Sequence, residues 1–478
     1  DLTSFPKTNV KNKGKYLGLA EKGRKTENNL PVGLDYIASL GITHLQLLPF
    51  YDFETVDESK PSANYNWGYD PANYNVPEGS FAVDPYDPLS RIKELKTMVQ
   101  ALHDHDIRLI MDVVYNHVYN EYTHPFTVLV PGYYFRHLPD CRLANGTLCG
   151  NEIASERSMV KKYIIDSVLY WLNEYKLDGF RFDLMGILDT FTVKKLRQLF
   201  NEIDPSIILL GEGWNMGDVL PESIRATLER SQFLRNVSFF NDQFRNAIRG
   251  NVFDKYNRGF VSSGPTDRDF INYDLMQKKY AEPEQIIQYA AAHDNFTLFD
   301  QISSSVPDRS FQEYIQRQNL ANSIVILSQG IPFIHSGQEF LRTKFGNPNS
   351  YNAPDEINQI VWTESDRESV SYLKALIQFR KEHPVFRYPS FKKILKHVQA
   401  DFLSDHLIKV RIKDQADDYW VFFNSYQAKS YGLIDAGDYQ VYFAANNSYL
   451  DQEKTVSIAE GENTIAIDPL STLLLRKI

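Results

Sequence analysis

The sequence contains very little cysteine. Two occur among its 478 residues, Cys141 and Cys149, and both fall in one loop-like stretch. So few cysteines exclude a small scaffold held together by disulfide bonds, and no CxxC or HExxH spacing marks a metal site. The two thiols could close a short disulfide in a secreted protein or stay free, and the sequence leaves both alternatives open.

Long apolar runs and an excess of positive charge are missing too. No stretch reaches the roughly 18 apolar residues that span a bilayer, and the opening segment DLTSFPKTNVKNKGKY lacks the apolar region of a signal peptide. The sequence therefore does not decide the cellular compartment. The formal net charge of −10 argues against a nucleic acid or an anionic membrane as a partner, because both select clustered Lys and Arg.

Apolar and aromatic residues, in contrast, are plentiful. Hydrophobic residues make up 43% of the chain and aromatic residues 13%, with 29 Tyr. A chain of this length and composition suits a large α/β domain with an accessory module. Amphipathic rings also suit sugar binding, because the apolar face of a sugar stacks on a ring while its hydroxyl groups need polar neighbours.

Short apolar runs alternate with helix-like stretches over residues 1–383. This alternation predicts a parallel sheet with helices on both faces and, at this length, a (β/α)8 TIM barrel as the catalytic domain. The expected strands are Thr43–Pro49, Arg108–Tyr115, Asp178–Leu184, Ile207–Glu212, Asn236–Asn241, Gln285–His293 and Ile331–Ser336. The expected helices include Asp87–His105, Ser158–Tyr175, Thr192–Ile203 and Phe311–Leu327.

The pattern changes from about Pro384 onward. Short runs with partial alternation, separated by Asn, Asp and Gly, predict a small antiparallel β-sandwich over residues 384–478. Its strands are expected at Leu407–Ile412, Tyr419–Asn424, Tyr439–Phe443, Thr464–Ile467 and Leu473–Arg476. Within the barrel, no regular structure is expected between Val118 and Glu156, and an insertion at about 118–157 would stand over the carboxyl ends of the strands.

Polar clusters end four of the expected strands: DVVYNH at 112–117, GFRFD at 179–183, GEGW at 211–214 and HDN at 293–295. Because the carboxyl ends of parallel strands meet at one mouth of a barrel, these side chains are expected to converge there.

The spacing within these clusters indicates a chemistry. Arg181 and Asp183 share one face of a strand, so the guanidinium favours an ionised, nucleophilic Asp183. Glu212 on the next strand would meet Asp183 as a like charge, which favours its protonated form and suits a general acid. Carboxylates at one level of adjacent strands could lie about 5–5.5 Å apart, the geometry of a retaining glycoside hydrolase. The alternative is a buried Arg181–Asp183 pair with Glu212 as part of a loop.

These segments resemble a known family. DVVYNH, GFRFDLMG, GEGW and HDN are similar, in order and spacing, to the four conserved regions of the α-amylase superfamily. The segment Tyr65-Asn-Trp-Gly-Tyr-Asp-Pro71 resembles the signature heptapeptide of type I pullulanases, which are starch-debranching glycosidases. Nearly the whole chain shares the resemblance, through KNKGKYLGLAE, PEGSFAVDP, IASER, FFNDQFRNAIRG, QGIPFIHSGQEF and NSYNAPDEIN.

The resemblance implies a retaining hydrolase of carbohydrate metabolism that cleaves α-1,6-glucosidic branch linkages in pullulan, amylopectin and related limit dextrins. It implies that Asp183 is the nucleophile, Glu212 the acid/base and Asp294 the transition-state stabiliser. The residues implied to contact the sugar at the cleaved bond are Tyr69, which would stack on it, His117, Arg181 and His293. Further implied substrate contacts are Trp67, Trp214, Asn295, Tyr351 and Asp355, with lid packing as an alternative for Trp67 and Tyr351.

Departures from the superfamily pattern narrow the predicted bond specificity. Amylases specific for α-1,4 bonds carry a Lys-His pair shortly after the nucleophile, whereas Leu184-Met185-Gly186 follows Asp183 here. This difference argues against an ordinary α-amylase. It leaves an isoamylase-like or mixed α-1,4/α-1,6 glucan hydrolase as one alternative and a catalytically silent glucan-binding protein as another.

The resemblance also raises the question of calcium. Asn116 resembles a calcium ligand of many amylases, but its partner carboxylates are not evident in the 118–157 loop. We therefore expect that no cofactor or catalytic metal is required, and a structural calcium ion stays an open alternative.

Seven strands precede the predicted sandwich, although a closed barrel needs eight. In resembling proteins the first strand ends just before the segment that matches Lys11–Glu21, and Asp1-Leu2-Thr3 resembles the tail of that strand. We therefore expect the first strand to be truncated in this chain. Upstream domains or another chain would complete the barrel, because an open barrel exposes unpaired strand edges.

Overall fold

The computed structural model describes residues 2–60, 65–365 and 367–478, so that Asp1 of the expected first-strand tail lies outside the described residues. Leu2 and Thr3 are not in a strand. The chain forms two compact units, the first made of Asp1–Phe240, Lys279–Ala281 and Tyr351–Gln359 and the second of Asn241–Lys278, Glu282–Ser350 and Ile360–Ile478. The domain boundary expected at residue 383 and the completing upstream strand stay predictions.

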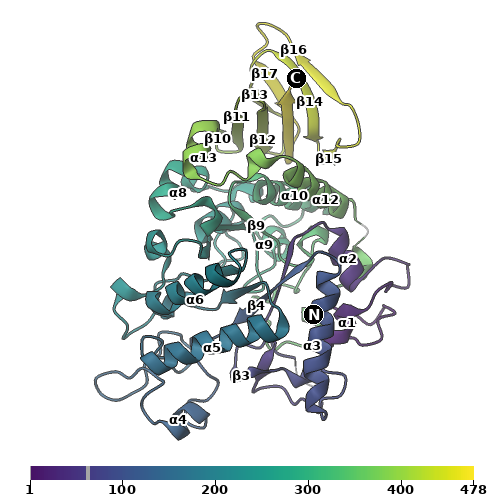
Figure 1. The fold of residues 1–478 in the computed structure, drawn as a ribbon. Coiled ribbons are helices and arrows are strands. Elements are labelled where there is room, and N and C mark those ends of the chain that lie inside the picture. Colours follow the sequence, from purple (N-terminus) through teal and green to yellow (C-terminus); the bar gives the residue numbers. More distant parts are fainter. Residues whose placement is uncertain (1, 61–64, 366) are drawn as a thin grey trace. The chain divides into compact units, whose positions relative to one another are not determined.

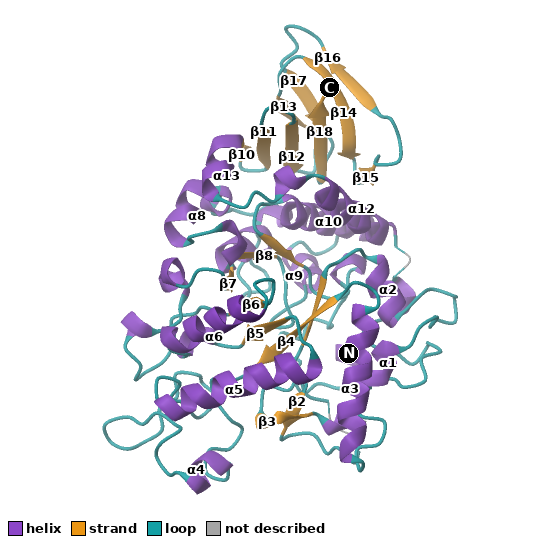
Figure 2. Cartoon of the chain, viewed as in Figure 1, coloured by secondary structure: helices purple, strands orange, loops and turns teal. Residues whose placement is uncertain are grey.

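The first unit contains a parallel sheet in the order β1-β4-β5-β6-β7, of which β4 is labelled in Figure 1 and β4 to β7 in Figure 2. Its strands are β1 His44–Leu47, β4 Arg108–Val113, β5 Gly179–Phe182, β6 Ile208–Gly211 and β7 Ser238–Phe240. Each lies inside a strand predicted from the sequence. Side chains on both faces of β5 and β7 are buried, as expected of a parallel sheet covered on both sides. A separate antiparallel pair is formed by β2 Tyr51–Phe53 and β3 Pro71–Pro77.

The helices of the first unit follow the local sequence signals. At the start of the helix after Asp87, that carboxylate accepts a hydrogen bond from the Leu89 N–H, and Pro88 occupies the first turn. Val160, Ile164 and Val168 form an apolar stripe on the helix that begins at Ser158. The helices are α1 Tyr16–Ala20, α2 Gly33–Ser39, α3 Pro88–His103, α4 Pro125–Leu129, α5 Ser158–Tyr175, α6 Thr190–Ile203 and α11 Asp355–Asn358.

The prediction that nothing regular lies between Val118 and Glu156 was wrong. The stretch contains α4 and isolated bridges that pair Phe135 with Ile153 and His137 with Leu143. A five-residue helix is too short to show a periodic pattern, and isolated bridges leave none. The fully buried Arg136 donates to Glu152 at 3.1 Å and to Glu156 at 2.9 Å, so that ion pairs fix this loop.

The second unit begins with α/β structure and continues into a β-sandwich. Strands β8 Ile286–Tyr289 and β9 Ile331–Phe333 pair in parallel, with Tyr289 opposite Phe333. Ser310 caps the helix that follows it through the Glu313 N–H. The helices that begin in this unit are α7 Asp242–Arg249, α8 Tyr273–Lys279, α9 Leu298–Ser305, α10 Phe311–Leu327, α12 Glu368–Glu382 and α13 Phe391–His397.

Every strand pairing after residue 398 that the structure describes is antiparallel. The main sheet has the order β10-β11-β12-β18-β14-β15 with β16 on β14, and β13 pairs with β17. The strands are β10 Val398–Ser404, β11 Leu407–Lys413, β12 Asp418–Asn424, β13 Ser430–Leu433, β14 Gly437–Ala444, β15 Asn447–Ser448, β16 Thr455–Ile458, β17 Thr464–Ile467 and β18 Ser471–Lys477. Trp420, Phe422, Tyr439 and Leu475 lie in its apolar core. The predicted fold class, a parallel barrel-type α/β fold followed by an antiparallel β-sandwich, is confirmed.

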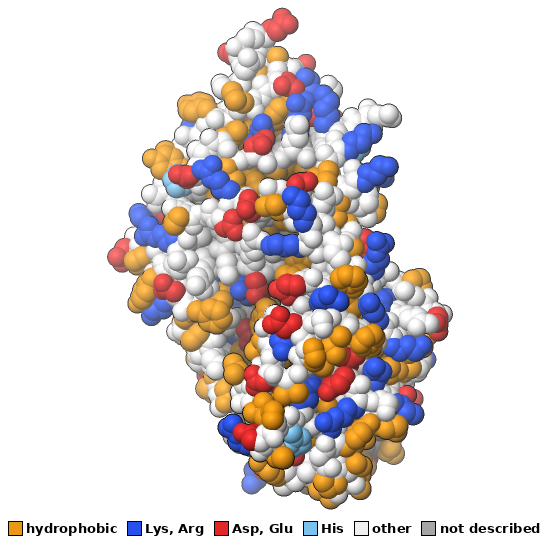
Figure 3. Space-filling view, turned by 90° about the vertical axis from the view of Figure 1, so that its left-hand side faces the viewer, with side chains coloured by type: hydrophobic (Ala, Val, Ile, Leu, Met, Phe, Trp, Pro, Cys, Tyr) orange, Lys and Arg blue, Asp and Glu red, His pale blue; other side chains and the backbone are white. Residues whose placement is uncertain are grey.

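Two surface properties complete the description. Of the helices in the described part of the chain, none combines the length and the hydropathy needed to cross a membrane. On the face drawn in Figure 3, Lys and Arg side chains are interspersed with Asp and Glu rather than gathered into a field of one sign.

Candidate active site

The register of the parallel sheet sets the polar residues of the first unit side by side. Pairing of β4 with β5 places Asp112 opposite Arg181, and pairing of β5 with β6 places Phe182 opposite Gly211. Asp183 and Glu212 are the next residues of those two strands, so they leave the sheet at one level. The Glu212 N–H donates to the Phe182 carbonyl at 3.2 Å, which extends the ladder to that level.

A single buried guanidinium joins the carboxylates. Nη1 of Arg181 lies 2.9 Å from Oδ1 of Asp183 and 3.0 Å from Oδ1 of Asp112, and Nη2 donates to Oε1 of Glu212. Burial alone lowers the pKa of Arg181, but the charges of Asp112 and Glu212 outweigh burial and raise it well above its ordinary value. The sequence predicted the convergence of Arg181, Asp183 and Glu212. It did not predict that Arg181 contacts three carboxylates, those of Asp112, Asp183 and Glu212.

Asp112 is the residue of this cluster that sequence reasoning missed. Its side chain is fully buried, and Oδ2 accepts a hydrogen bond of 2.6 Å from the Tyr69 hydroxyl. Burial raises the pKa of Asp112 to about 7, although Arg181 opposes that shift. The available signal was its place in DVVYNH, but the pairing of Asp112 with Arg181 depends on a strand register that the sequence does not reveal.

Asn116 and His117 connect the nucleophile candidate to Tyr69. Asn116 Nδ2 donates to Oδ2 and to the main-chain oxygen of Asp183, both at 2.8 Å. Nδ1 of His117 lies 2.5 Å from Asn116 Oδ1, and its Nε2 lies 2.9 Å from the Tyr69 carbonyl oxygen. Burial lowers the pKa of His117, whereas the charge of Asp183 and the hydrogen bond to the Tyr69 carbonyl act in the opposite direction. Because both ring nitrogens have protein partners, His117 links two site residues here, and its contact with a sugar stays a prediction.

The heptapeptide packs on the segment that contains Tyr351 and Asn358. The Trp67 side chain is buried, its indole N–H donates to Asn358 Oδ1 at 3.3 Å, and its main-chain N–H donates to the Tyr351 carbonyl at 2.9 Å. This burial favours the packing alternative for Trp67. The ring of Tyr351 is 44% exposed, and Asp355 at the start of α11 is exposed too, so both are accessible to a ligand.

The segment after Asp183 fits closely against the segment after Glu212. Oε2 of Glu212 accepts from the Leu184 N–H at 3.0 Å, and the Glu212 carbonyl accepts from the Gly186 N–H at 2.9 Å. A Cβ added to Gly186 would lie 1.9 Å from the Trp214 carbonyl oxygen. A glycine is therefore required where residue 186 approaches the main chain of Trp214. The Trp214 side chain itself is partly exposed.

The second unit carries the other predicted residues in the loop between β8 and α9. Nε2 of His293 lies 3.4 Å from Oδ2 of Asp294, and the Asp294 side chain is 46% exposed. Asn295 has a φ of +61°, the left-handed region that Asn tolerates better than most residues. Two buried cations that the sequence did not indicate, Arg249 and Lys344, donate to main-chain oxygens of this loop.

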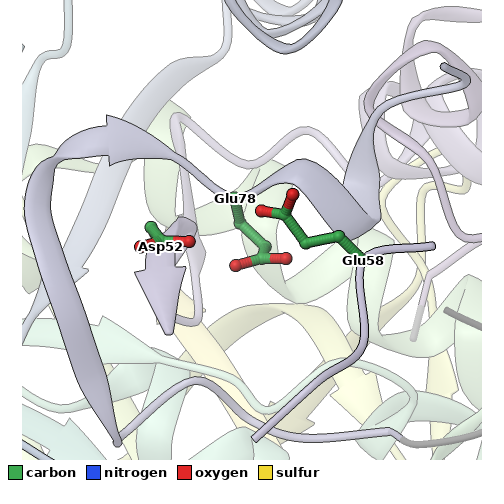
Figure 4. Close-up of side chains that lie close together, drawn as sticks. All are labelled: Asp52, Glu58 and Glu78. Carbon is green, nitrogen blue, oxygen red and sulfur yellow. The ribbon is translucent and has the colours of Figure 1, made fainter. Parts of the chain in front are cut away.

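Three carboxylates elsewhere in the first unit lie close enough to share an ion. The side chains of Asp52, Glu58 and Glu78 offer oxygens within 4.8 Å of one another, with Glu78 in the middle (Figure 4). Arg91 forms an ion pair of 2.6 Å with Glu58, and burial raises the pKa of Glu78 to about 7. The charge of Arg91 and the raised pKa of Glu78 both reduce the repulsion among the three carboxylates.

The side-chain oxygen of Asn116, the residue that resembles a calcium ligand, has a protein partner in this structure. Oδ1 of Asn116 already contacts His117, as described above. Within residues 2–60, 65–365 and 367–478, the one group of three or more His, Cys, Asp or Glu side chains close enough to share a metal ion is the three-carboxylate group at Asp52. We therefore assign no step to a metal ion.

Comparisons with known proteins agree with these features. A family model described as the α-amylase catalytic domain matches residues 3–127. The pullulanase of Bacillus subtilis strain 168 is 44% identical over 425 residues, which cover 87% of this chain and 59% of that protein. The chain thus spans about three-fifths of the length of that curated relative.

Two solved structures cover the whole chain. The pullulanase of Paenibacillus barengoltzii in complex with maltohexaose and α-cyclodextrin is 40% identical, with a TM-score of 0.94 and 76% of its own chain covered. The type I pullulanase of Bacillus subtilis strain 168 in complex with maltose is 39% identical, with a TM-score of 0.95 and 68% of its chain covered.

Proposed function

This chain belongs to the pullulanase family of glycoside hydrolases, and we propose that it cleaves α-1,6-glucosidic branch linkages in pullulan, amylopectin and related limit dextrins. The observation that carries the proposal is the Arg181 guanidinium, which holds Asp183 and Glu212 at the ends of two adjacent strands. The related proteins solved with maltose and with maltohexaose support an α-glucan or oligosaccharide as the substrate, and its branched character is part of the proposal.

The arrangement supports a double-displacement mechanism. A carboxylate oxygen of Asp183 attacks the anomeric carbon, the bond from that carbon to the leaving glucan oxygen breaks, and Glu212 gives its proton to that oxygen. Glu212 then takes a proton from water, the water oxygen bonds to the anomeric carbon, and Asp183 departs. Two inversions retain the α configuration.

The neighbouring residues have supporting roles in this mechanism. Arg181 and Asn116 each donate to a different oxygen of Asp183, which fixes the carboxylate plane for attack. The role proposed for Asp294, stabilisation of the oxocarbenium-like transition state, rests on the family resemblance. Two carboxylates and water complete the chemistry, so the proposal requires no cofactor.

A mixed or isoamylase-like glucan hydrolase is the second candidate. The heptapeptide at 65–71 and the missing Lys-His pair after Asp183 favour the α-1,6-specific hydrolase proposed above. A silent glucan-binding protein is disfavoured, because Asp183, Glu212 and Asp294 are all present.

The products released from pullulan and glycogen test the proposal. Cleavage of α-1,6 bonds in pullulan releases maltotriose, whereas cleavage of α-1,4 bonds releases panose or its isomer. We expect maltotriose, and slower action on glycogen than on pullulan; the reverse preference would favour the isoamylase-like candidate. Asp183→Asn and Glu212→Gln should each lower turnover by several orders of magnitude while the protein stays folded.

A further inference from the structure

The loop that carries Asp294 has no regular structure of its own. Residues 290–297 connect β8 to α9 and lie outside helix and strand, although the Thr297 carbonyl accepts the first hydrogen bond of α9 from the Gln301 N–H. A loop without regular main-chain hydrogen bonding would be a poor support for a carboxylate that must meet a transition state with sub-ångström accuracy. Its support comes instead from two side chains that are distant in sequence.

Arg249 holds the two ends of the loop. This residue ends α7 and is completely buried. Its Nη1 donates to the Ala290 carbonyl at 3.3 Å, and its Nη2 donates to the carbonyls of Phe296 at 2.6 Å and Thr297 at 3.1 Å. One planar guanidinium thereby fixes the distance between the residues that precede and follow the His293–Asn295 turn.

Lys344 holds the middle of the loop. Its side chain is 1% exposed, and its Nζ donates to the His293 carbonyl oxygen at 2.5 Å. The Lys344 main chain is itself anchored, because its N–H donates to Oδ2 of Asp300 in α9 at 2.9 Å. Thr343 Oγ1 donates to the other oxygen of Asp300. Residues 343 and 344 are therefore both hydrogen-bonded to α9, the helix that follows the loop.

Burying two cations against neutral carbonyls is costly compared with burying apolar side chains of similar size. Burial and the charge of Arg342 lower the pKa of Lys344 to about 7, whereas Asp294 and Asp300 act in the opposite direction. Burial likewise lowers the pKa of Arg249 to about 9. The cost, and the contacts of both side chains with the loop that contains Asp294, indicate that Arg249 and Lys344 do more than fill space.

We propose that Arg249 and Lys344 are positioning residues, which clamp the main chain of loop 290–297 so that the Asp294 carboxylate is held where the transition state requires it. This inference rests on the role proposed for Asp294. Neither cation needs to touch the substrate, because both are buried and act on main-chain oxygens.

Turnover of pullulan by Lys344→Met and Arg249→Lys tests the clamp. Each variant should lower kcat between about tenfold and a hundredfold, with KM changed by less than about threefold, because alignment is lost and ground-state binding is kept. Arg380→Lys is the matched control. Arg380 is another buried arginine of the same unit, and it donates to the carbonyls of Ile326, Ser328, Gly330 and Phe386. This control should lower the melting temperature but leave kcat unchanged.

A double-mutant cycle separates positioning from general weakening of the fold. If Lys344 acts through Asp294, Lys344→Met should change the residual kcat of Asp294→Asn by less than about twofold. A wild-type kcat in Lys344→Met, or an equal loss in both backgrounds, would overturn the inference.

Hydrogen exchange distinguishes failure of the clamp from failure of the proposed function. Amides of residues 290–297 should exchange faster in Lys344→Met than in the wild type. Unchanged exchange overturns the clamp whatever Asp294 does. An Asp294→Asn enzyme with wild-type kcat overturns the role proposed for Asp294 whatever the loop does.

Discussion

Asn116 Nδ2 lies 2.8 Å from Oδ2 of Asp183 and donates a hydrogen bond to it. The same amide donates to the Asp183 main-chain oxygen. The residue that resembles a calcium ligand of amylases therefore serves as a direct partner of the nucleophile candidate in this chain.

Asn116→Ala should lower kcat by about ten- to a hundredfold on pullulan, because a hydrogen bond to a charged group contributes about 1.5–3 kcal/mol. Asn116→Asp should do more damage, since it sets a like charge beside Asp183. Steady-state kinetics measure both. Asn322→Ala, at a buried asparagine of the second unit, is the control and should lower stability only. Full activity in Asn116→Ala would contradict the account.

Tyr69 is expected to act through both its ring and its hydroxyl. Tyr69→Phe keeps the ring but removes the donor to the buried Asp112, which should cost about 1–3 kcal/mol of stability. Tyr69→Ala also removes the ring and should depress turnover of pullulan much more strongly, because stacking on the sugar is lost. Thermal unfolding and kinetics of the two variants separate the effects. Equal kinetic damage from both would mean that the hydroxyl, rather than the ring, matters for turnover.

Gly186 should not tolerate a side chain. A Cβ there would meet the Trp214 carbonyl oxygen at 1.9 Å, so Gly186→Ala must displace the segment that follows Glu212. We expect at least about a tenfold loss of kcat. Gly132→Ala is the control, because no atom lies within 4 Å of its added Cβ and only its positive φ is strained. The test is the turnover of pullulan by the two variants. Similar kinetics would contradict a requirement for glycine next to the Trp214 carbonyl.

Glu78 should make the stability of the fold depend on pH. Burial raises its pKa from 4.5 to about 7 on folding, so the folded state binds a proton that the unfolded state releases. This stabilising contribution is fully present below about pH 4.5 and is lost as the pH rises through 7. Urea unfolding of the wild type and Glu78→Gln between pH 5 and 8 measures it. Glu78→Gln should show a weaker decline of unfolding free energy, and an identical decline would contradict the assignment.

Local signals in the sequence predicted much of the fold. The bounds of α5 and α10 match the prediction to the residue, because each helix is long and has apolar residues that recur along its whole length. Strands β4, β5 and β6 were identifiable as near-continuous apolar runs, interrupted within β4 by Asp112 and within β5 by Arg181. Both α4 and β16 were missed, and the five residues of α4 are too few to show a helical period.

Residues of the candidate site could be predicted only where they belong to a short sequence motif at the end of a strand. Asp183 and Glu212 directly follow apolar strands, and Asp294 lies in the HDN motif after another. Asp112, Arg249 and Lys344 act through contacts set by strand register or by main-chain carbonyls distant in sequence. Neither a register nor a carbonyl contact leaves a pattern in residue types, so these roles needed the structure.

The most direct test of the account is a proton NMR time course of the wild-type protein acting on pullulan. One spectrum resolves α-1,6 and α-1,4 anomeric signals and the configuration of each new reducing end. We predict that α-1,6 signals decline, α-1,4 signals persist, and the α-anomer of maltotriose forms first. A decline of α-1,4 signals, or a β-anomer as the first product, would contradict retaining α-1,6 hydrolysis by Asp183 and Glu212.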